Sequence, residues 1–146
     1  MDKISKEQRS KNMSKIRSTD IKPEVFLRRE LFARGFRYRK NVGGLQGRPD
    51  IVLKKYGAAV FVHGCFWHGH KNCNKSRIPE TNREFWAEKI AKNIARDERT
   101  VAHLRAHGWR VLIVWTCALS NKEKAVQTVQ AVAGWLKTDD SFAEIS

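Results

Sequence analysis

Apolar and polar positions follow a helical period at the start of this chain and a strand period soon after it. A first helix is predicted over residues 20–34, because Asp20 can cap it, Pro23 suits a first turn and Gly35 ends it. Its apolar side is expected to consist of Val25, Leu27, Leu31 and Phe32. Aromatic and basic residues then alternate, which predicts a short strand at 36–40.

The rest of the pattern predicts a hairpin, a long helix, a buried strand and a final helix. Apolar runs at 50–53 and 58–62 are separated by four residues, as in a hairpin. A capping-box pattern at 81–84 opens a helix of about 25 residues that Gly108 ends. Its buried stripe is expected to be Ala87, Ile90, Ile94, Val101 and Leu104. The run 111–114 reads as a strand buried on both faces, and a second capping box at 120–123 opens a helix to Leu136.

This order of elements predicts an α/β fold in which a mixed sheet is sandwiched between helices. The chain has 146 residues and no linker or repeat, so we expect a single domain over 1–146. Residues 4–17 are polar, basic and too poor in apolar side chains for a core helix, and 1–19 are therefore expected to form an arm that contacts the partner. The acidic segment 139–146 is expected to be frayed.

The charge of the chain indicates a polyanionic partner. The formal net charge is +14, and residues 1–40 hold 13 Lys/Arg against 5 Asp/Glu. No run approaches the roughly 20 apolar residues of a membrane helix, and the first residues lack the apolar core of a secretory signal, so a cytoplasmic protein is expected. Three cysteines in a reducing compartment favour metal binding over disulfides.

Residues 62–73 concentrate the chemistry, with three of the five histidines and two of the three cysteines. Cys65, His70 and Cys73 have the ligand types and short spacing that Zn²⁺ favours, which leaves His63 and His68 for other work. Asp50 stands where a loop enters a predicted strand, and we expect it to meet the two histidines at adjacent strand ends. Taken alone, the Pro-Asp pair before that strand is more often a turn signal.

At this point the chain resembles a known family, the very-short-patch-repair mismatch endonucleases, over roughly residues 8–137. The resemblance is carried by Arg48-Pro49-Asp50, His63-Gly64-Cys65-Phe66-Trp67-His68, Arg83-Glu84-Phe85-Trp86, Lys92-Asn93, Arg96-Asp97 and the run 108–117. It implies a restriction-endonuclease-like, three-layer sandwich. It also implies Mg²⁺-dependent nicking of double-stranded DNA 5′ to the thymine of a T·G mismatch left by deamination of 5-methylcytosine.

The resemblance also implies roles for individual residues. Asp50 would ligate Mg²⁺, His68 would act as general base on the attacking water, and Asp97 would orient that histidine. Glu24 and His63 match further active-site positions. The family often has threonine where this chain has Val62, so only the main-chain carbonyl of Val62 can contribute to the metal. Compared with the family pattern, this chain also has one extra residue between His68 and Cys73.

Cys117, directly after the buried strand, is the expected fourth zinc ligand. Four protein ligands would close the coordination shell and make the zinc structural, so that catalysis belongs to Mg²⁺. Without the cluster, Cys117 would be read as a small buried hydrophobe.

Aromatic side chains are candidates for DNA recognition. Phe66, Trp67 and Trp86 could wedge between base pairs, although core packing is the alternative. Trp109, Trp115 and Trp135 are assigned to the core. By the resemblance Met13, Lys89 and Asn93 would contact the mismatched pair; otherwise they would be solvent-facing.

Two other functions stay open from the sequence, a non-catalytic zinc module that binds DNA and a nuclease specific for sequence or branched structure. A convergent acid and two histidines argue against the first. We expect a monomer, with mismatch-repair proteins as candidate partners.

Overall fold

The structure is a computed structural model, and it describes residues 22–40 and 44–146. Its helices are α2 (Lys22–Ala33), α3 (Arg83–Ala106) and α4 (Lys122–Leu136), and its strands are β1 (Ile51–Leu53), β2 (Ala58–His63), β3 (Arg110–Trp115) and β4 (Phe142–Ile145). Short 3-10 turns follow β1 (Lys54–Tyr56), precede α3 (Asn74–Ser76) and follow β3 (Thr116–Leu119). No helix in these ranges is long and apolar enough to cross a membrane.

The four strands form one mixed sheet in the order β1-β2-β3-β4. β1 and β2 are the predicted antiparallel hairpin, whereas β2, β3 and β4 run parallel. Parallel neighbours need a crossover, and α3 and α4 supply the two crossovers. The expected α/β fold with a mixed sheet is confirmed.

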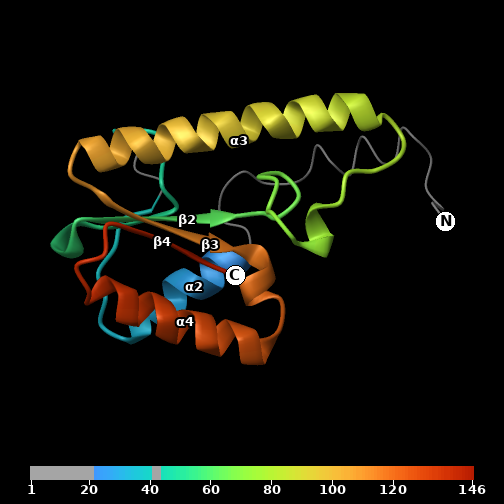
Figure 1. The fold of residues 1–146 in the computed structure, drawn as a ribbon. Coiled ribbons are helices and arrows are strands. Elements are labelled where there is room, and N and C mark those ends of the chain that lie inside the picture. The colour runs from blue at the N-terminus through green and yellow to red at the C-terminus, as the bar shows by residue number, and fades with distance from the viewer. Residues whose placement is uncertain (1–21, 41–43) are drawn as a thin grey trace.

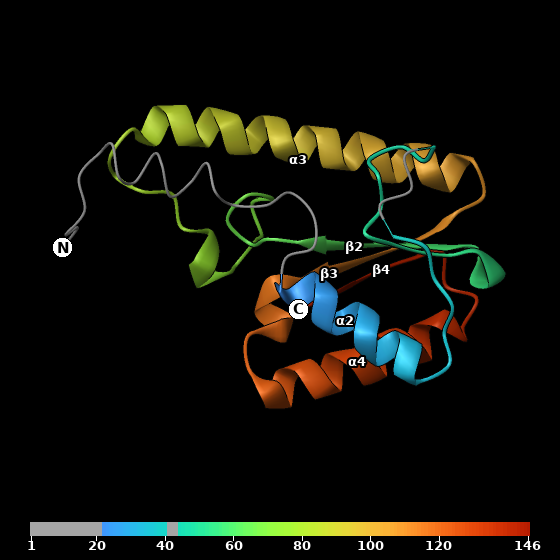
Figure 2. The same cartoon turned by 180° about the vertical axis from the view of Figure 1, so that it is seen from behind.

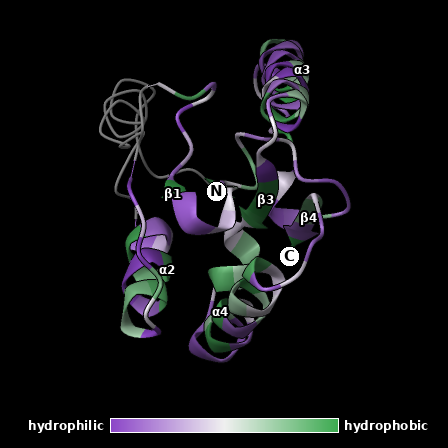
Figure 3. Ribbon diagram, turned by 90° about the vertical axis from the view of Figure 1, so that its left-hand side faces the viewer, coloured by the Kyte–Doolittle hydropathy of each residue, from purple (hydrophilic) through white to green (hydrophobic). Residues whose placement is uncertain are grey.

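Helices cover both faces of the sheet, with α3 on one side and α2 and α4 on the other (Figures 1 and 2). Figure 3 shows the three layers after a quarter turn. The layer between the sheet and α2 and α4 contains Leu27, Leu31, Val60, Val62, Leu112, Val114, Val129 and Val132. The layer that faces α3 contains Ala59, Phe61, Cys65, Leu104, Val111, Ile113 and Trp115. Successive side chains of β2 and β3 thus enter opposite layers, which explains their unbroken apolar runs.

The predicted strand at 36–40 is wrong in its pairing, since the structure has only an isolated bridge between Arg39 and Val52. The alternation of aromatic and basic residues that suggested a strand instead reflects the packing of the aromatic side chains on the core. Phe36 is buried against the ring of Tyr56, at 5.4 Å between centroids, and Tyr38 packs on the same core from the surface.

The predicted fraying of the segment 139–146 is also wrong, because residues 142–145 form β4. The backbone N–H of Val111 donates to the carbonyl of Ser141 at 3.0 Å, and Arg110 Nε donates to the carbonyl of Asp140 at 2.9 Å. Phe142, Ala143 and Ile145 pack against the two core layers. Four residues are too few to show a period, so the acidic composition hid this strand.

Smaller corrections concern helix starts and apolar positions. The caps are Asn82 and Asn121 rather than Thr81 and Ser120; Asn121 accepts from the backbone N–H of Lys124 at 2.8 Å. Phe32 is 54% exposed beneath the guanidinium of Arg37, and Ala87 is exposed. Trp115 and Trp135 are core residues as predicted, whereas Trp109 is only partly buried against the α3-facing layer.

Candidate active site

The start of β1 and the end of β2 lie side by side, because these strands are antiparallel. Asp50 stands immediately before β1, and its Oδ2 accepts a hydrogen bond from the backbone N–H of Val62 at 2.6 Å. His63 is the next residue and ends β2. The sheet therefore brings Asp50 and His63 to one edge, as expected from the order of the strands.

The Asp50 carboxyl is half-buried beside a second carboxyl, that of Glu24. Burial raises its pKa to about 8, and a hydrogen bond to Glu24 adds to the rise, while the backbone N–H of Val62 and the charge of Arg28 act against it. Glu24 and Arg28 come from α2, where both are buried and form an ion pair at 3.0 Å. Two carboxyl groups that share a buried site retain a proton unless a cation is present, so the donor set suits a hard divalent ion.

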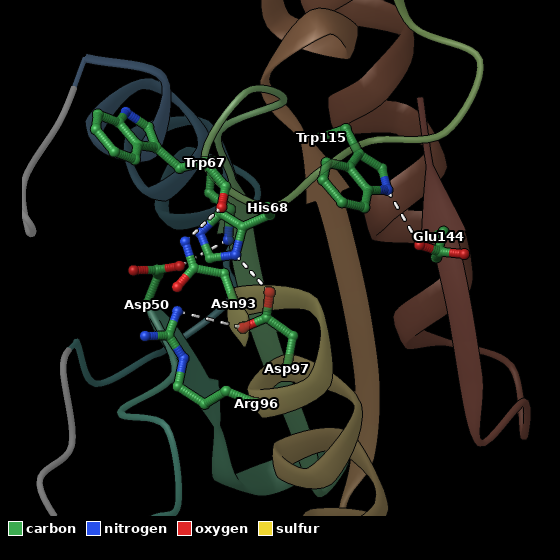
Figure 4. A network of polar contacts seen from close by, with 9 residues as sticks. Asp50, Trp67, His68, Asn93, Arg96, Asp97, Trp115 and Glu144 are labelled. Carbon is green, nitrogen blue, oxygen red and sulfur yellow. Dashed lines mark hydrogen bonds and ion pairs between the residues drawn. The ribbon is translucent and has the colours of Figure 1, made fainter. Parts of the chain in front are cut away.

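His68 is held by Asp97 of α3 (Figure 4). His68 Nδ1 and Asp97 Oδ2 are 2.6 Å apart, and Arg96 Nη2 lies 3.7 Å from the other carboxylate oxygen. Burial alone would raise the pKa of Asp97, but the hydrogen bond and charge of His68 hold that pKa below its ordinary value. Asp97 is thus ionised at neutral pH and can only accept, so Nδ1 of His68 carries a proton and its Nε2 is left to act as a base.

His63 stacks on His68 with ring centroids 3.8 Å apart and planes at 5°. Burial, helped by the neighbouring His68, lowers the pKa of His63 to about 3, so the ring is neutral at physiological pH. Its Nδ1 is buried and has no hydrogen-bond partner among the described residues. Because the His63 ring is neutral, it places no positive charge beside His68.

The four predicted zinc ligands converge although they come from two crossovers. The candidate ligand atoms of Cys65, His70, Cys73 and Cys117 all lie within 4.8 Å of one another, and Cys117 Sγ is 3.6 Å from His70 Nδ1. Sulfur and imidazole in a group of four match the tetrahedral preference of Zn²⁺.

Electrostatics in this group also fit a cation. Burial raises the pKa of Cys65, but hydrogen bonds from Thr116 and Cys117 outweigh burial and hold that pKa below its ordinary value. Burial and the neighbouring Cys65 raise the pKa of Cys117 to about 11. The thiols therefore cannot all ionise together without a metal, and a divalent cation would remove that conflict.

The loop between the candidate zinc ligands Cys65 and His70 forms an aromatic cluster with the first turn of α3. Phe66, Trp67 and Trp86 are half-buried, with ring centroids 5.2–5.8 Å apart in edge-on pairs. Phe85 extends the cluster, since its ring centroid is 5.1 Å from that of Trp86 and its side chain is 58% exposed. Phe85 was not among the predicted DNA-binding residues, although an exposed aromatic beside Trp86 was readable from the helical period.

α3 fixes this loop in place. Gly69 has φ +60°, and a Cβ there would lie 2.6 Å from Ile94 Cδ1 and 2.8 Å from Ile90 Cγ2, so only glycine permits the approach. Asn93 Nδ2 donates to the Trp67 carbonyl at 2.9 Å (Figure 4). Asn93 thus contacts the loop that carries Trp67.

The remaining predicted site residues are placed as follows. Lys89 is exposed on α3, Val62 is buried in β2, and Met13, like the whole arm 1–19, lies outside the described residues. Arg28 was missed, although its position four residues after Glu24 on a helix is a readable ion-pair signal.

Comparisons with known proteins identify relatives of this chain. A family model described as DNA mismatch endonuclease Vsr matches residues 1–75. The DNA mismatch endonuclease Vsr of Escherichia coli is 42% identical over 94% of this chain and 88% of its own length. The Type II nicking enzyme V.NmeAIP of Neisseria meningitidis is 54% identical over 78% of this chain and 81% of its own length.

Among solved structures, the catalytic domain of the homing endonuclease I-Bth0305I superposes with a TM-score of 0.51, over 82% of this chain and all of that domain, at 21% identity. That similarity concerns the fold alone. The family-model match and the identity to the E. coli enzyme decide the relationship: this chain belongs to the Vsr family of DNA mismatch endonucleases.

Proposed function

We propose that the protein is a Mg²⁺-dependent endonuclease that nicks one strand of double-stranded DNA 5′ to the thymine of a T·G mismatch. The observation that carries the proposal is the 2.6 Å contact between His68 and an ionised Asp97. Asp50 lies beside the end of β2, where its carboxylate accepts from the backbone of Val62. A protein that only binds DNA has no use for a base aimed in this way. We also assign the three layers to the restriction-endonuclease-like class, which the similarity to a homing endonuclease domain supports.

In this mechanism the residues act on water and phosphate. Asp97 accepts a hydrogen bond from Nδ1–H of His68, which leaves Nε2 to take a proton from the attacking water. Asp50, with Glu24 nearby and the main-chain carbonyl of Val62, would hold Mg²⁺. When bound, that ion would stabilise the negative charge that gathers on the phosphate and the leaving oxygen. His63 stays neutral beside His68 and so does not oppose its protonation.

Mismatch recognition is assigned to the aromatic cluster, to Lys89 and Asn93 and to the arm with Met13. A T·G pair stacks less well than a Watson–Crick pair, so the insertion of aromatic rings beside it costs less. The structure supports a wedge because Phe66 and Trp67 lie on a loop anchored to α3 by Gly69 and Asn93.

The nicking assay compares duplexes that differ only in T·G against T·A, in several sequence contexts. We expect Mg²⁺-dependent nicking of T·G alone, abolished by Asp50→Asn and by His68→Ala but not by His103→Ala, an exposed histidine of α3. DNA binding should survive the first two changes. Nicking by Asp50→Asn at the wild-type rate would refute the catalytic assignment.

A second candidate is a nicking enzyme that selects a sequence, because several relatives are named Type II nicking enzymes. Wild-type protein that nicks T·A and T·G duplexes equally in one sequence context would favour this candidate. Trp67→Ala is the discriminating variant, since under the mismatch proposal it loses preference for T·G while retaining most DNA affinity.

A further inference from the structure

Trp115, the last residue of β3, lies between the zinc ligands and the candidate active site. Its ring stacks on that of His70, with centroids 4.2 Å apart and planes at 9°. It meets His63 edge-on, with centroids at 5.3 Å, and pairs with it in the β2–β3 register. One indole thus contacts both a candidate zinc ligand and a histidine of the active site.

Glu144 of β4 fixes the orientation of this indole. Trp115 Nε1 donates to Glu144 Oε1 at 3.1 Å (Figure 4). Glu144 pairs with Ile113, two residues before Trp115, so the parallel register puts both side chains on the same face of the sheet. Trp115 is 7% exposed. Glu144 itself is exposed and the hydrogen bond is part-buried, so another rotamer of Trp115 would lose this partner and the stacking on His70 together.

The strand that supplies Glu144 is itself well attached. The Arg105 guanidinium lies over the Phe142 ring at 5.6 Å, and Arg105 also donates to the Ser141 hydroxyl at 3.1 Å. β4 is therefore joined to α3 as well as to β3.

We propose that Glu144 is a positioning residue that locks Trp115 in the plane on which His70 and His63 pack, and so couples the C-terminal strand to zinc retention and to nicking. The inference rests on the proposed function and adds to it a residue that does not touch metal or DNA. Groups that orient metal-binding histidines commonly change affinity or activity by about tenfold or more when removed. Here the group acts through a stacked ring in place of a direct hydrogen bond.

The test compares Glu144→Ala with Glu144→Gln, whose amide oxygen can still accept from the indole. Asp139→Ala is the matched control, since it removes an exposed carboxylate from the same segment. Three quantities are measured on full-length protein: the rate of zinc release to a chromogenic chelator, the single-turnover nicking rate at saturating protein, and the Kd for the same duplex without Mg²⁺.

We expect Glu144→Ala to release zinc about tenfold faster and to nick about tenfold more slowly. The Kd should stay within about twofold, because the charges that bind phosphate are unchanged. Glu144→Gln should recover most of both rates, and Asp139→Ala should match wild type. Wild-type behaviour of Glu144→Ala would overturn the proposal, as would a glutamine variant as impaired as the alanine one.

A spectroscopic measurement keeps the test decisive if the alanine variant folds poorly. The indole N–H resonance of Trp115, assigned by its loss in Trp115→Phe, should move upfield in Glu144→Ala and lie close to its wild-type position in Glu144→Gln. An unmoved resonance would refute the hydrogen bond itself. Wild-type protein without zinc or without mismatch nicking would instead refute the proposed function, whatever the Glu144 variants do.

Discussion

The two aspartates of the site have opposite electrostatic environments, and their proposed roles follow from the difference. Burial beside Glu24 raises the pKa of Asp50 to about 8, which favours a cation as the partner of its ionised form. The contact with His68 holds the pKa of Asp97 low, so that it stays ionised and orients a base. Groups of one type with pKa values pushed apart are typical of sites that divide acid, base and metal-binding work.

Asp50→Asn is predicted to stabilise the protein in the absence of Mg²⁺. A carboxyl whose pKa is raised by folding contributes stability that is present below about pH 4 and lost as the pH rises through about 8. An amide escapes this loss. We therefore expect Asp50→Asn to raise the melting temperature at pH 8.5 by about 3 °C or more, roughly 1 kcal/mol for a chain of this size, and to have little effect at pH 4.

Thermal melts of zinc-loaded protein across this pH range check the prediction, with the exposed Asp139→Asn as control. A wild-type and an Asp50→Asn curve that run parallel from pH 4 to 8.5 would contradict the assigned environment of Asp50.

Asp97→Asn is predicted to lower the nicking rate by about 100-fold or more. An amide can donate to Nδ1 and so allow the tautomer of His68 that carries its proton on Nε2, where the base is needed. Glu98→Gln, at the exposed neighbouring position, is the control. Single-turnover nicking at saturating protein measures the effect, and a rate within twofold of wild type would remove Asp97 from the mechanism.

At the scale of elements, α3 contacts both the aromatic cluster and His68, the proposed general base. Trp86, Asn93 and Asp97 are seven and four residues apart, which puts them on one side of the helix, and Ile90 and Ile94 between them receive Gly69. The loop with Phe66 and Trp67, proposed to recognise the mismatch, and His68, the proposed general base, thus both contact a single helix.

Gly69→Ala tests this mounting. A Cβ there meets Ile94 at 2.6 Å and the backbone must also keep φ +60°, so the loop has to move or the protein loses stability of roughly 1–3 kcal/mol. We expect a reduced nicking rate on T·G and a weaker preference over T·A. Gly64→Ala in the same loop is the matched control, because the nearest atom to its Cβ, Trp67 Cδ1, is at an ordinary 3.6 Å. Equal behaviour of the two variants would refute the role given to α3.

The sequence predicted those elements whose signal is local. The long α3, the hairpin and the buried β3 were readable from period and length. The convergence of four candidate zinc ligands was readable from residue type, from the short spacing of Cys65, His70 and Cys73, and from the place of Cys117 directly after a strand. Elements that depend on distant partners were misjudged. β4 forms because Arg110 and β3 bind the segment that contains it. Phe36 and Tyr38 are apolar because both pack on a core built from residues distant in the sequence, which a short stretch of sequence does not reveal. The link from Glu144 through Trp115 to His70 joins three segments and left no sequence pattern.

At the scale of the whole molecule, charge is predicted to dominate DNA affinity. The net charge is +14, and residues 1–40 hold 13 Lys/Arg against 5 Asp/Glu. Each phosphate neutralised releases counterions, so log Kd should rise steeply and linearly with log salt concentration. Deletion of residues 1–18 should flatten that slope on matched and mismatched duplexes alike. An affinity independent of salt would contradict binding to DNA altogether.

The four candidate zinc ligands lie where they could join the ends of two strands of the sheet. Cys65 follows β2 and Cys117 follows β3, so one ion would tie the ends of two parallel strands, beside His63 and Trp115. Structural zinc contributes directly to folding. Cys117→Ser should therefore lower both the zinc content, from about one ion per chain, and the melting temperature, whereas a cysteine that merely fills space would tolerate serine at a cost of about 1 kcal/mol.

Chelation separates this ion from the catalytic one. Protein stripped with a strong chelator should recover nicking when Zn²⁺ and Mg²⁺ are both returned, but not with Mg²⁺ alone, because the strand ends that carry His63 and the loop to His68 are no longer held. Cys117→Ser should remain poorly active in either case. The control is wild-type protein dialysed without chelator, which needs only Mg²⁺. Full recovery of the stripped enzyme with Mg²⁺ alone, with no zinc detected by metal analysis, would show that the cysteine and histidine cluster has no structural metal.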